Sequence, residues 1–256
     1  MAAETEKELQ QLKKRFSELA DKSYQQSIYT FSGFLSLAEQ EALFEVMDSR
    51  KFRDFRLWGG HENCERQMLR IGKPEEVGYE EQFPVTAVHV RPLMEKFADN
   101  LTHRDFLGAV MNLGIERSTV GDIFIEGKQA WIFCMEKIAP YICENLDKVR
   151  HTSVKCQIAE GETAFTVKEP ERIGLIVSGI RVDAILAKVY NLSRNQSLDL
   201  FRAGKVYVNG RLCENNSYSL KEGDKVSARG FGRFVFLGIG SETRKGRLNV
   251  SMGVYK

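Results

Sequence analysis

The sequence of 256 residues is poor in the features that mark membrane, secreted or fibrous proteins. Only 5 residues are Pro, and no apolar run approaches the roughly 18–20 residues of a membrane span. The 5 Cys are odd in number and widely spaced, which disfavours a disulfide framework and favours reduced thiols. Because the first residues are polar, we expect no secretory signal and a cytoplasmic protein without a membrane partner.

Patterns for cofactor or metal chemistry are also scarce. There is no P-loop, and the Gly-x-Gly pairs near the carboxyl end lack the strand–turn–helix context of a dinucleotide site. His61 and Cys64 lie close together, but no second ligand pair follows at zinc spacing. His103, Arg104 and Asp105 are adjacent and would point in different directions on a helix, so they cannot form a triad. We expect no catalytic residues, cofactor, metal or small-molecule substrate.

Charge is distributed unevenly along the chain. Residues 1–180 hold 23 Lys and Arg against 29 Asp and Glu, a net charge of −6. Residues 181–256 hold 14 against 6, a net charge of +8. A basic segment on an acidic body indicates a polyanionic partner for that segment, although a solvated basic surface is the alternative.

Apolar spacing predicts a multidomain α+β protein. Residues 1–80 are expected to form a mainly helical domain, with amphipathic helices around 9–19 and 35–47 and a strand–turn–strand over 52–72. Residues 81–162 follow the order β-α-β-β-α-β of ferredoxin-like and RRM-like modules. The expected strands of this module are 85–90, 122–126, 130–135 and 153–158, and its helices are 102–113 and 138–149.

The rest of the chain is expected to be a linker over 163–179, which includes a short apolar run, and a domain over 180–256. That domain begins with two helices, and Ser193 can cap the second of them. Strands follow around a hairpin whose Asn209-Gly210 pair is typical of a type I′ turn.

Four short motifs follow one another in this last segment: RVDAIL at 181–186, SR at 193–194, GKVYVNG at 204–210 and KEGDKV at 221–226. In this order and at this spacing they closely resemble the S4 RNA-binding domain, a fold of the αL type. Asp199 departs from the pattern, because S4 domains often carry a base there. Asp183 is expected to orient a helix start or to pair with an Arg.

The resemblance and the charge together predict one basic, RNA-binding face on the paired helices. Free N–H groups at a helix start favour phosphate, and the fork of an Arg side chain fits phosphate oxygens. The candidate RNA-binding residues are Arg181, Lys188, Ser193, Arg194, Asn195, Arg202, Lys205, Tyr207, Arg211, Arg229 and Arg233.

The middle segment carries a second resemblance. The stretches THRDFLGA at 102–109, GIER at 114–117 and GDI at 121–123 resemble the central domain of the bacterial YlmH family of S4-domain proteins. Here Thr102 is expected to cap a helix. We expect His103, Arg104 and Arg117 to form a second contact with RNA or tRNA. Phe124, Trp131 and Phe133 could stack on bases, but their alternation favours the core.

The YlmH resemblance implies a cytoplasmic, non-enzymatic and ribosome-associated protein. Members are linked to large-subunit complexes that hold peptidyl-tRNA, in the rescue of stalled nascent chains. The implied partners are large-subunit ribosomal RNA and tRNA or peptidyl-tRNA. Two alternatives stay open. S4 domains also occur on RNA-modifying enzymes such as pseudouridine synthases, and the chain could be a free RNA or tRNA chaperone.

Overall fold

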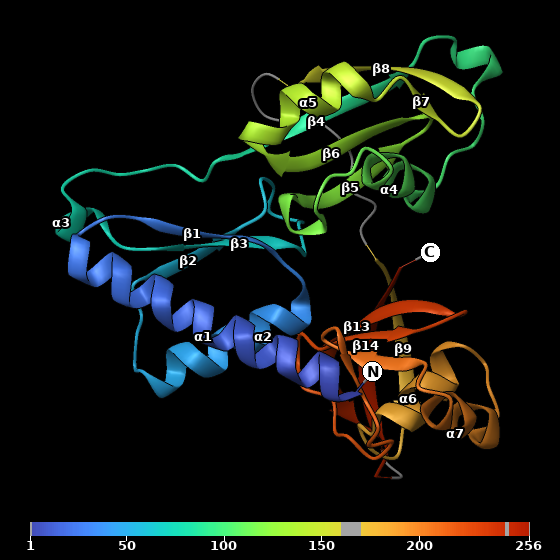
Figure 1. Ribbon diagram of the computed structural model, residues 1–256. Coiled ribbons are helices and arrows are strands. Elements are labelled where there is room, and N and C mark those ends of the chain that lie inside the picture. Colours follow the sequence, from blue (N-terminus) through green and yellow to red (C-terminus); the bar gives the residue numbers. More distant parts are fainter. Residues whose placement is uncertain (1, 160–169, 244–245, 256) are drawn as a thin grey trace. The chain divides into compact units, whose positions relative to one another are not determined.

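The computed structural model describes residues 2–159, 170–243 and 246–255, which divide into two compact units at residues 167 and 168 (Figure 1). Within these residues no helix is long and apolar enough to cross a membrane.

The first unit begins with two helices on one face of a small antiparallel sheet (Figure 1). The elements are α1 (Ala2–Gln26), β1 (Thr30–Leu35), α2 (Leu37–Ser49), β2 (Phe55–Trp58), β3 (Gln67–Ile71) and α3 (Pro74–Val77). The sheet order is β1-β3-β2. Phe16 of α1 and Leu43 of α2 pack with Leu69 and Ile71 of β3. Both predicted helices and the strand–turn–strand are confirmed.

The prediction of a mainly helical first domain missed strand β1. The register of β1 against β3 shifts at a bulge between Phe31 and Phe34. The buried positions of β1 include the polar residues Thr30 and Ser32, so β1 lacks the apolar alternation by which a strand is recognised. The next helix, α2, begins at Ser36. There the Ser36 hydroxyl accepts from the N–H of Glu39, and the Glu39 carboxylate accepts from the N–H of Ser36.

The middle region has the predicted βαββαβ order. Its elements are β4 (Val85–Pro92), η1 (Glu95–Phe97), α4 (His103–Met111), η2 (Arg117–Thr119), β5 (Val120–Glu126), β6 (Gln129–Met135), η3 (Glu136–Ile138), α5 (Ala139–Asn145), β7 (Lys148–Val149) and β8 (Thr152–Ile158). The sheet order is β5-β6-β4-β8-β7, and every paired strand is antiparallel. The ferredoxin-like topology is therefore confirmed.

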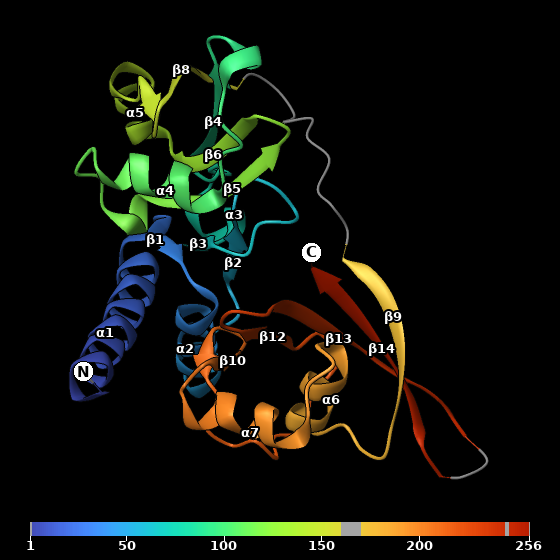
Figure 2. The same ribbon diagram turned by 90° about the vertical axis from the view of Figure 1, so that its right-hand side faces the viewer.

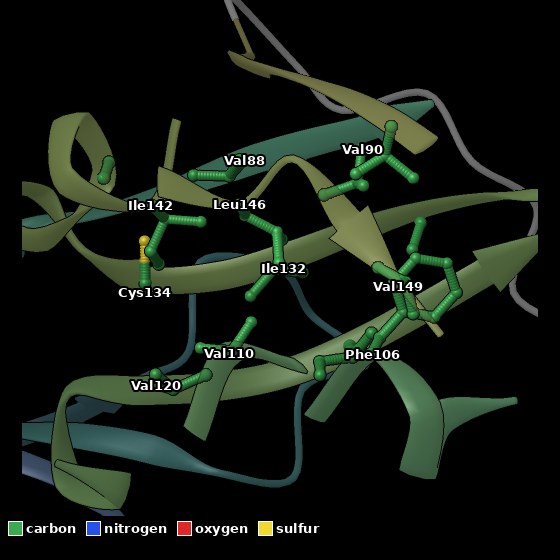
Figure 3. Close-up of a cluster of buried hydrophobic side chains, with 14 of the residues drawn as sticks. Val88, Val90, Phe106, Val110, Val120, Ile132, Cys134, Ile142, Leu146 and Val149 are labelled. Carbon is green, nitrogen blue, oxygen red and sulfur yellow. The ribbon is translucent and has the colours of Figure 1, made fainter. Parts of the chain in front are cut away.

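The second helix of this region is shorter than predicted. The backbone leaves the helical region at Leu146, and β7 forms a tight hairpin with β8 through Arg150, whose φ is +54°. The helices α4 and α5 pack on one face of the sheet (Figure 3). Phe106 and Val110 of α4 and Ile142 of α5 are fully or almost fully buried there. Each contributes about 1.5–3 kcal/mol of burial free energy.

The opposite face of this sheet is closed by the loop between β2 and β3. Trp131 and Phe133 are 8% and 2% exposed, so the expectation that they are buried is confirmed. They do not join the core beneath the helices. Phe133 packs with Cys64 and Ala87, and the His61 ring lies 6.4 Å from the Phe133 ring between centroids. The loop leaves no room for a base on Phe133.

A half-buried carboxylate fixes this loop to the middle region. Asp122 at the start of β5 accepts hydrogen bonds from the N–H of Glu65, at 2.5 Å, and from the N–H of Arg66, at 2.8 Å. The Arg66 guanidinium donates to the carbonyl oxygens of Phe34 and Val120. Burial raises the pKa of the Asp122 carboxyl, and these hydrogen bonds oppose that rise. The segments 1–80 and 81–162 thus share one compact unit.

The second unit is a six-stranded antiparallel sheet with two helices on one face (Figure 2). Its elements are β9 (Glu171–Val177), α6 (Val182–Val189), α7 (Arg194–Arg202), β10 (Val206–Val208), β11 (Arg211–Leu212), β12 (Lys225–Ala228), β13 (Gly232–Glu242) and β14 (Leu248–Tyr255). The sheet order is β11-β10-β12-β13-β14-β9. Val182, Ile185 and Leu186 of α6 and Phe201 of α7 pack on the buried side chains of the strands.

The expected linker over 163–179 needs a correction. Residues 160–169 lie outside the described part, but residues 171–177 form β9, which pairs along its full length with β14. Its apolar side chains Ile173 and Leu175 face Met252 and Val250 across the strands. The apolar run therefore belongs to the sheet, because it completes the core of the second unit.

We predict that Gly60→Ala destabilises the first unit by about 2 kcal/mol. An added Cβ would lie 2.4 Å from Cδ1 of Phe133, and overpacking of this kind costs about 1–3 kcal/mol. Gly78→Ala is the matched control, because Gly78 has a similar φ of +90° with open space around it. Urea denaturation followed by Trp fluorescence measures both. Equal destabilisation by the two variants would show that backbone strain alone is responsible.

Candidate nucleic-acid interface

The first helix of the second unit begins at an ion pair between a partly exposed arginine and a buried carboxylate. The Asp183 carboxylate accepts from Nε of Arg181 at 3.0 Å, from Nη2 at 2.8 Å, and from the N–H of Ala184 at 2.8 Å. The Asp183 side chain is 6% exposed. The pairing predicted for Asp183 is confirmed. The fork of Arg181 is therefore directed at a carboxylate of its own domain, which limits its use toward phosphate.

The start of the second helix carries exposed polar and cationic side chains. Ser193 caps α7 as predicted: its hydroxyl accepts from the N–H of Gln196, and the Gln196 side chain accepts from the N–H of Ser193. Arg194 and Asn195 in the first turn are exposed, as is Lys188 in the last turn of α6. We name Lys188, Arg194 and Asn195 the helix corner. No acidic residue lies between Asp183 and Asp199.

The side chains of the helix corner have no hydrogen bond or ion pair within the described residues. A cation at a helix N-terminus is unfavourable by itself, because the free N–H groups there carry partial positive charge. An anion at the helix corner would interact favourably with both the cationic side chains and the free N–H groups. At the other end of α7, Arg202 pairs with Asp199 at 2.9 Å in full solvent exposure, a pair of about 0–1 kcal/mol.

A second group of candidates lies on the sheet face away from the helices. Strand pairing sets Tyr207, Ser227, Arg233 and Tyr255 in one row. The buried neighbours of these residues in the strands face the helices. The Arg229 guanidinium lies over the Tyr207 ring at 4.7 Å, and that of Arg233 lies over the Tyr255 ring at 4.5 Å.

The prediction of one basic face is therefore wrong. Arg181, Lys188, Arg194 and Arg202 belong to the helices, whereas Tyr207 and Arg233 belong to the opposite side of the sheet. Two further candidates, Lys205 and Arg211, lie in or beside the strands β10 and β11 at one edge of the sheet. Lys205 is exposed just before β10, and its carbonyl oxygen accepts from the N–H of Arg229. Arg211 is half-buried in β11, opposite the core residue Val208.

The motif residues of the hairpin are structural. Asn209 has a φ of +50° and Gly210 one of +81°, as the predicted type I′ turn requires. The buried Asp224 carboxylate accepts from the Asn209 amide at 2.9 Å, from the Tyr218 hydroxyl at 3.1 Å and from the N–H of Lys221 at 2.8 Å. Asp224 thereby joins the motif at 221–226 to the motif at 204–210.

The middle region contributes a groove beside α4, with a volume of about 480 Å³. Arg104 lines this groove together with Lys148 and Arg150 of the β7–β8 hairpin. Lys148 and Arg150 were not among the predicted contact residues, because the helix was expected to continue to Val149. Two hydrogen bonds from Thr102 lower the pKa of the Asp105 carboxyl, which also pairs with Arg150 at 3.5 Å. His103 is exposed at the start of α4.

Arg117 is not placed for RNA contact. Its guanidinium donates to the carbonyl oxygens of Val120 and Gly121. Burial and then the nearby charge of Arg66 lower the pKa of Arg117 to about 10, so the side chain stays charged at neutral pH. Arg117 thereby binds the start of β5, where the register against β6 shifts between Val120 and Ile123.

Among the described residues no group of three or more His, Cys, Asp and Glu side chains is placed to hold a metal ion. Cys64 is buried, and burial raises the pKa of its thiol to about 12.

We predict that Asp183→Ala loosens the helix pair of the second unit. The variant leaves the Arg181 guanidinium and the N–H of Ala184 without their buried acceptor, a cost of about 2 kcal/mol. Asp199→Ala is the matched control, because its pair with Arg202 is exposed. Amide hydrogen exchange of peptides from α6 and α7 should accelerate in Asp183→Ala alone. Unchanged protection in both variants would contradict the role given to Asp183.

Comparisons with known proteins match both regions. Residues 79–163 match the family described as "Putative RNA-binding domain in YlmH", and residues 180–226 match the S4 domain. The chain is 31% identical over 195 residues to ribosome-associated protein quality control protein P2 of Bacillus subtilis, which covers 75% of each protein. The solved structure of cell division protein YlmH from Streptococcus pneumoniae is 18% identical, with a TM-score of 0.48, and covers 61% of this chain and 92% of that chain.

The two matched ranges coincide with the middle region and with the helix pair and hairpin of the second unit. The Bacillus subtilis relative extends over three quarters of both sequences. The chain therefore belongs to the YlmH family of S4-domain RNA-binding proteins.

Proposed function

We propose that the protein binds ribosomal RNA of the large subunit through the helix corner of its second unit and thereby acts in quality control of stalled nascent chains. The name of the Bacillus subtilis relative supports the second part of this proposal. Its action is occupancy of a ribosomal site in the cytoplasm and not chemical turnover.

The helix corner is the observation that carries the proposal. Lys188 and Arg194 are exposed cations without a neighbouring acid, beside the free N–H groups at the start of α7. Folded RNA offers phosphate oxygens on a rigid frame, and each phosphate contact releases counterions. Arg181 stabilises the helix corner indirectly, because its ion pair with Asp183 fixes the start of α6.

A tRNA or peptidyl-tRNA is the proposed second partner, and the groove beside α4 is its proposed contact. Arg104, Lys148 and Arg150 give the groove three cations, although Asp105 and Asp147 also line it. The sheet of this region is not the proposed surface, because the loop over Phe133 prevents base stacking there.

Two alternative functions compete with this proposal: the protein could be an RNA-modifying enzyme or a free RNA chaperone. Incubation of purified protein with ribosomal RNA and tRNA, followed by mass spectrometry of the nucleosides, tests the first rival, and a new modified base would favour it. Sedimentation of lysate tests the second. Co-migration with isolated large subunits supports the proposed function, whereas migration as free protein at low salt supports a chaperone.

We predict that Lys188→Ala/Arg194→Ala weakens binding to isolated large subunits at least ten-fold. Two lost phosphate contacts should also reduce the slope of log affinity against log salt by about 2. Arg172→Ala/Arg247→Ala is the matched control, because both residues are exposed cations of the same unit outside the helix corner. Filter binding over a series of salt concentrations measures both pairs.

Two outcomes would contradict the assignment to the helix corner. Equal losses in the two double variants would indicate a diffuse effect of net charge. A loss in Arg229→Ala/Arg233→Ala with none at the helix corner would move the interface to the opposite face of the sheet.

We predict that Arg104→Ala/Lys148→Ala weakens binding of purified tRNA several-fold and reduces its salt slope by about 2. The control is Lys137→Ala/Lys155→Ala, which removes two exposed cations of the same region outside the groove. Fluorescence anisotropy of end-labelled tRNA reports the affinities. Full tRNA affinity in the groove variant would remove the groove from the proposed function.

A further inference from the structure

A cleft on the first three-stranded sheet has the chemistry of a nucleobase site. It has a volume of about 500 Å³, within the range of small-ligand pockets. Arg56 and Trp58 of β2, Arg70 of β3 and Glu80 beyond α3 line it, together with Glu136 after β6. We name it the Arg56 cleft. Its sheet residues lie outside both matched ranges of the family comparisons.

Two arginines lie directly opposite each other in this cleft. Arg56 and Arg70 are Cα partners in the pairing of β2 with β3, so their side chains leave the sheet on the same face. Like charges in this position destabilise a sheet. Within the described residues neither arginine forms an ion pair with a carboxylate. An acceptor group in the cleft would offset this repulsion.

Arg70 is fixed and short of acceptors. It is 3% exposed, its guanidinium lies over the rings of Tyr29 and Phe83 at 4.9 and 5.2 Å, and its Nη1 donates to the carbonyl oxygen of Glu81. Its Nε–H has no acceptor among the described residues. A buried donor without a partner costs about 1–3 kcal/mol. Arg56, in contrast, is exposed and forms no hydrogen bond or ion pair among the described residues, so its fork can turn to a ligand.

The cleft also holds a stacking surface and acceptors. Trp58 is 38% exposed on the same strand face as Arg56, two residues away. Aromatic side chains of this kind stack on unpaired bases of single-stranded RNA. The carboxylates of Glu80 and Glu136 are exposed, and neither is paired with an arginine of the cleft.

We propose that the Arg56 cleft binds one unstacked guanine of an RNA chain. Guanine offers the acceptors O6 and N7, which an Arg fork binds in bidentate fashion. It also offers N–H donors on the adjoining edge, which suit a carboxylate. Trp58 stacks on the ring, Arg56 and Arg70 face its acceptor edge, and Glu80 or Glu136 accepts from its donor edge. This site goes beyond the proposed function, because it does not involve the helix corner.

The test uses the full chain and three heptaribonucleotides: UUUGUUU, UUUAUUU and UUUUUUU. The guanine-containing heptamer should quench Trp58 fluorescence and bind at least ten-fold more tightly than the other two. Trp58→Phe retains only Trp131 and supplies the background signal. Arg56→Ala should abolish the preference for guanine. The matched control, Arg15→Ala, removes an exposed cation of α1 and should leave the preference intact.

Equal quenching by all three heptamers, or a guanine preference that survives in Arg56→Ala, would overturn the proposal. Equal affinity for free guanosine monophosphate and for UUUGUUU would overturn the assignment to an RNA chain. Thermal unfolding of each variant, with an unchanged midpoint, shows that a loss of binding is local. Binding of large subunits is measured separately with the helix-corner variants, so failure of either site can be distinguished from failure of the other.

Discussion

The buried carboxylate of Asp183 is the interaction on which the second unit depends. The carboxylate oxygens accept from the Arg181 guanidinium and from the N–H of Ala184. The backbone carbonyl oxygen of Asp183 accepts from the Ser197 hydroxyl of α7 at 2.9 Å. One residue therefore fixes both the start of α6 and the position of α7 against it. The spacing of Lys188 and Arg194 at the helix corner follows, because each helix carries one of them.

Several residues that make the S4 pattern recognisable have structural roles. Asp183 and Asp224 are buried, and Asn209 is bound to Asp224. The ion pairs Arg202–Asp199 and Arg181–Asp183 differ in how easily a phosphate can displace the carboxylate from the arginine. Arg202 shares an exposed pair with Asp199, which is weak in water, so a phosphate can compete for it. Arg181 is held by a carboxylate that has no other cation nearby, and its release would leave a buried charge.

Much of the fold could be predicted because strong periodicity and capping residues agree along the chain. Ser193 and Thr102 mark helix starts, and the alternation in β5 and β6 is regular. The misses have local causes. The polar residues Thr30 and Ser32 at buried positions hide β1, and the apolar run of β9 pairs only with β14, more than 70 residues later in the chain.

The candidate site could be predicted only in part. Charge and motifs identify the residues, but they do not show which face of the sheet each side chain occupies. Strand register sends Tyr207 and Arg233 to the side opposite the helices. The sequence pattern predicted that Arg117 is available to RNA, yet its guanidinium donates to two carbonyl oxygens at the start of β5. Lys148 and Arg150 enter the groove because a hairpin replaces the last turn of the expected helix.

The loop between β2 and β3 changes how the first unit can meet RNA. In an RRM-like sheet, exposed aromatic rings on the open face stack on bases. Here the His61 ring lies beside Phe124 and Phe133, at centroid distances of 6.0 and 6.4 Å, and occupies the place of a base. Displacing it would break the bonds of Asp122 to the backbone of Glu65 and Arg66. Exposed cations of this unit line the groove beside α4 and the Arg56 cleft instead.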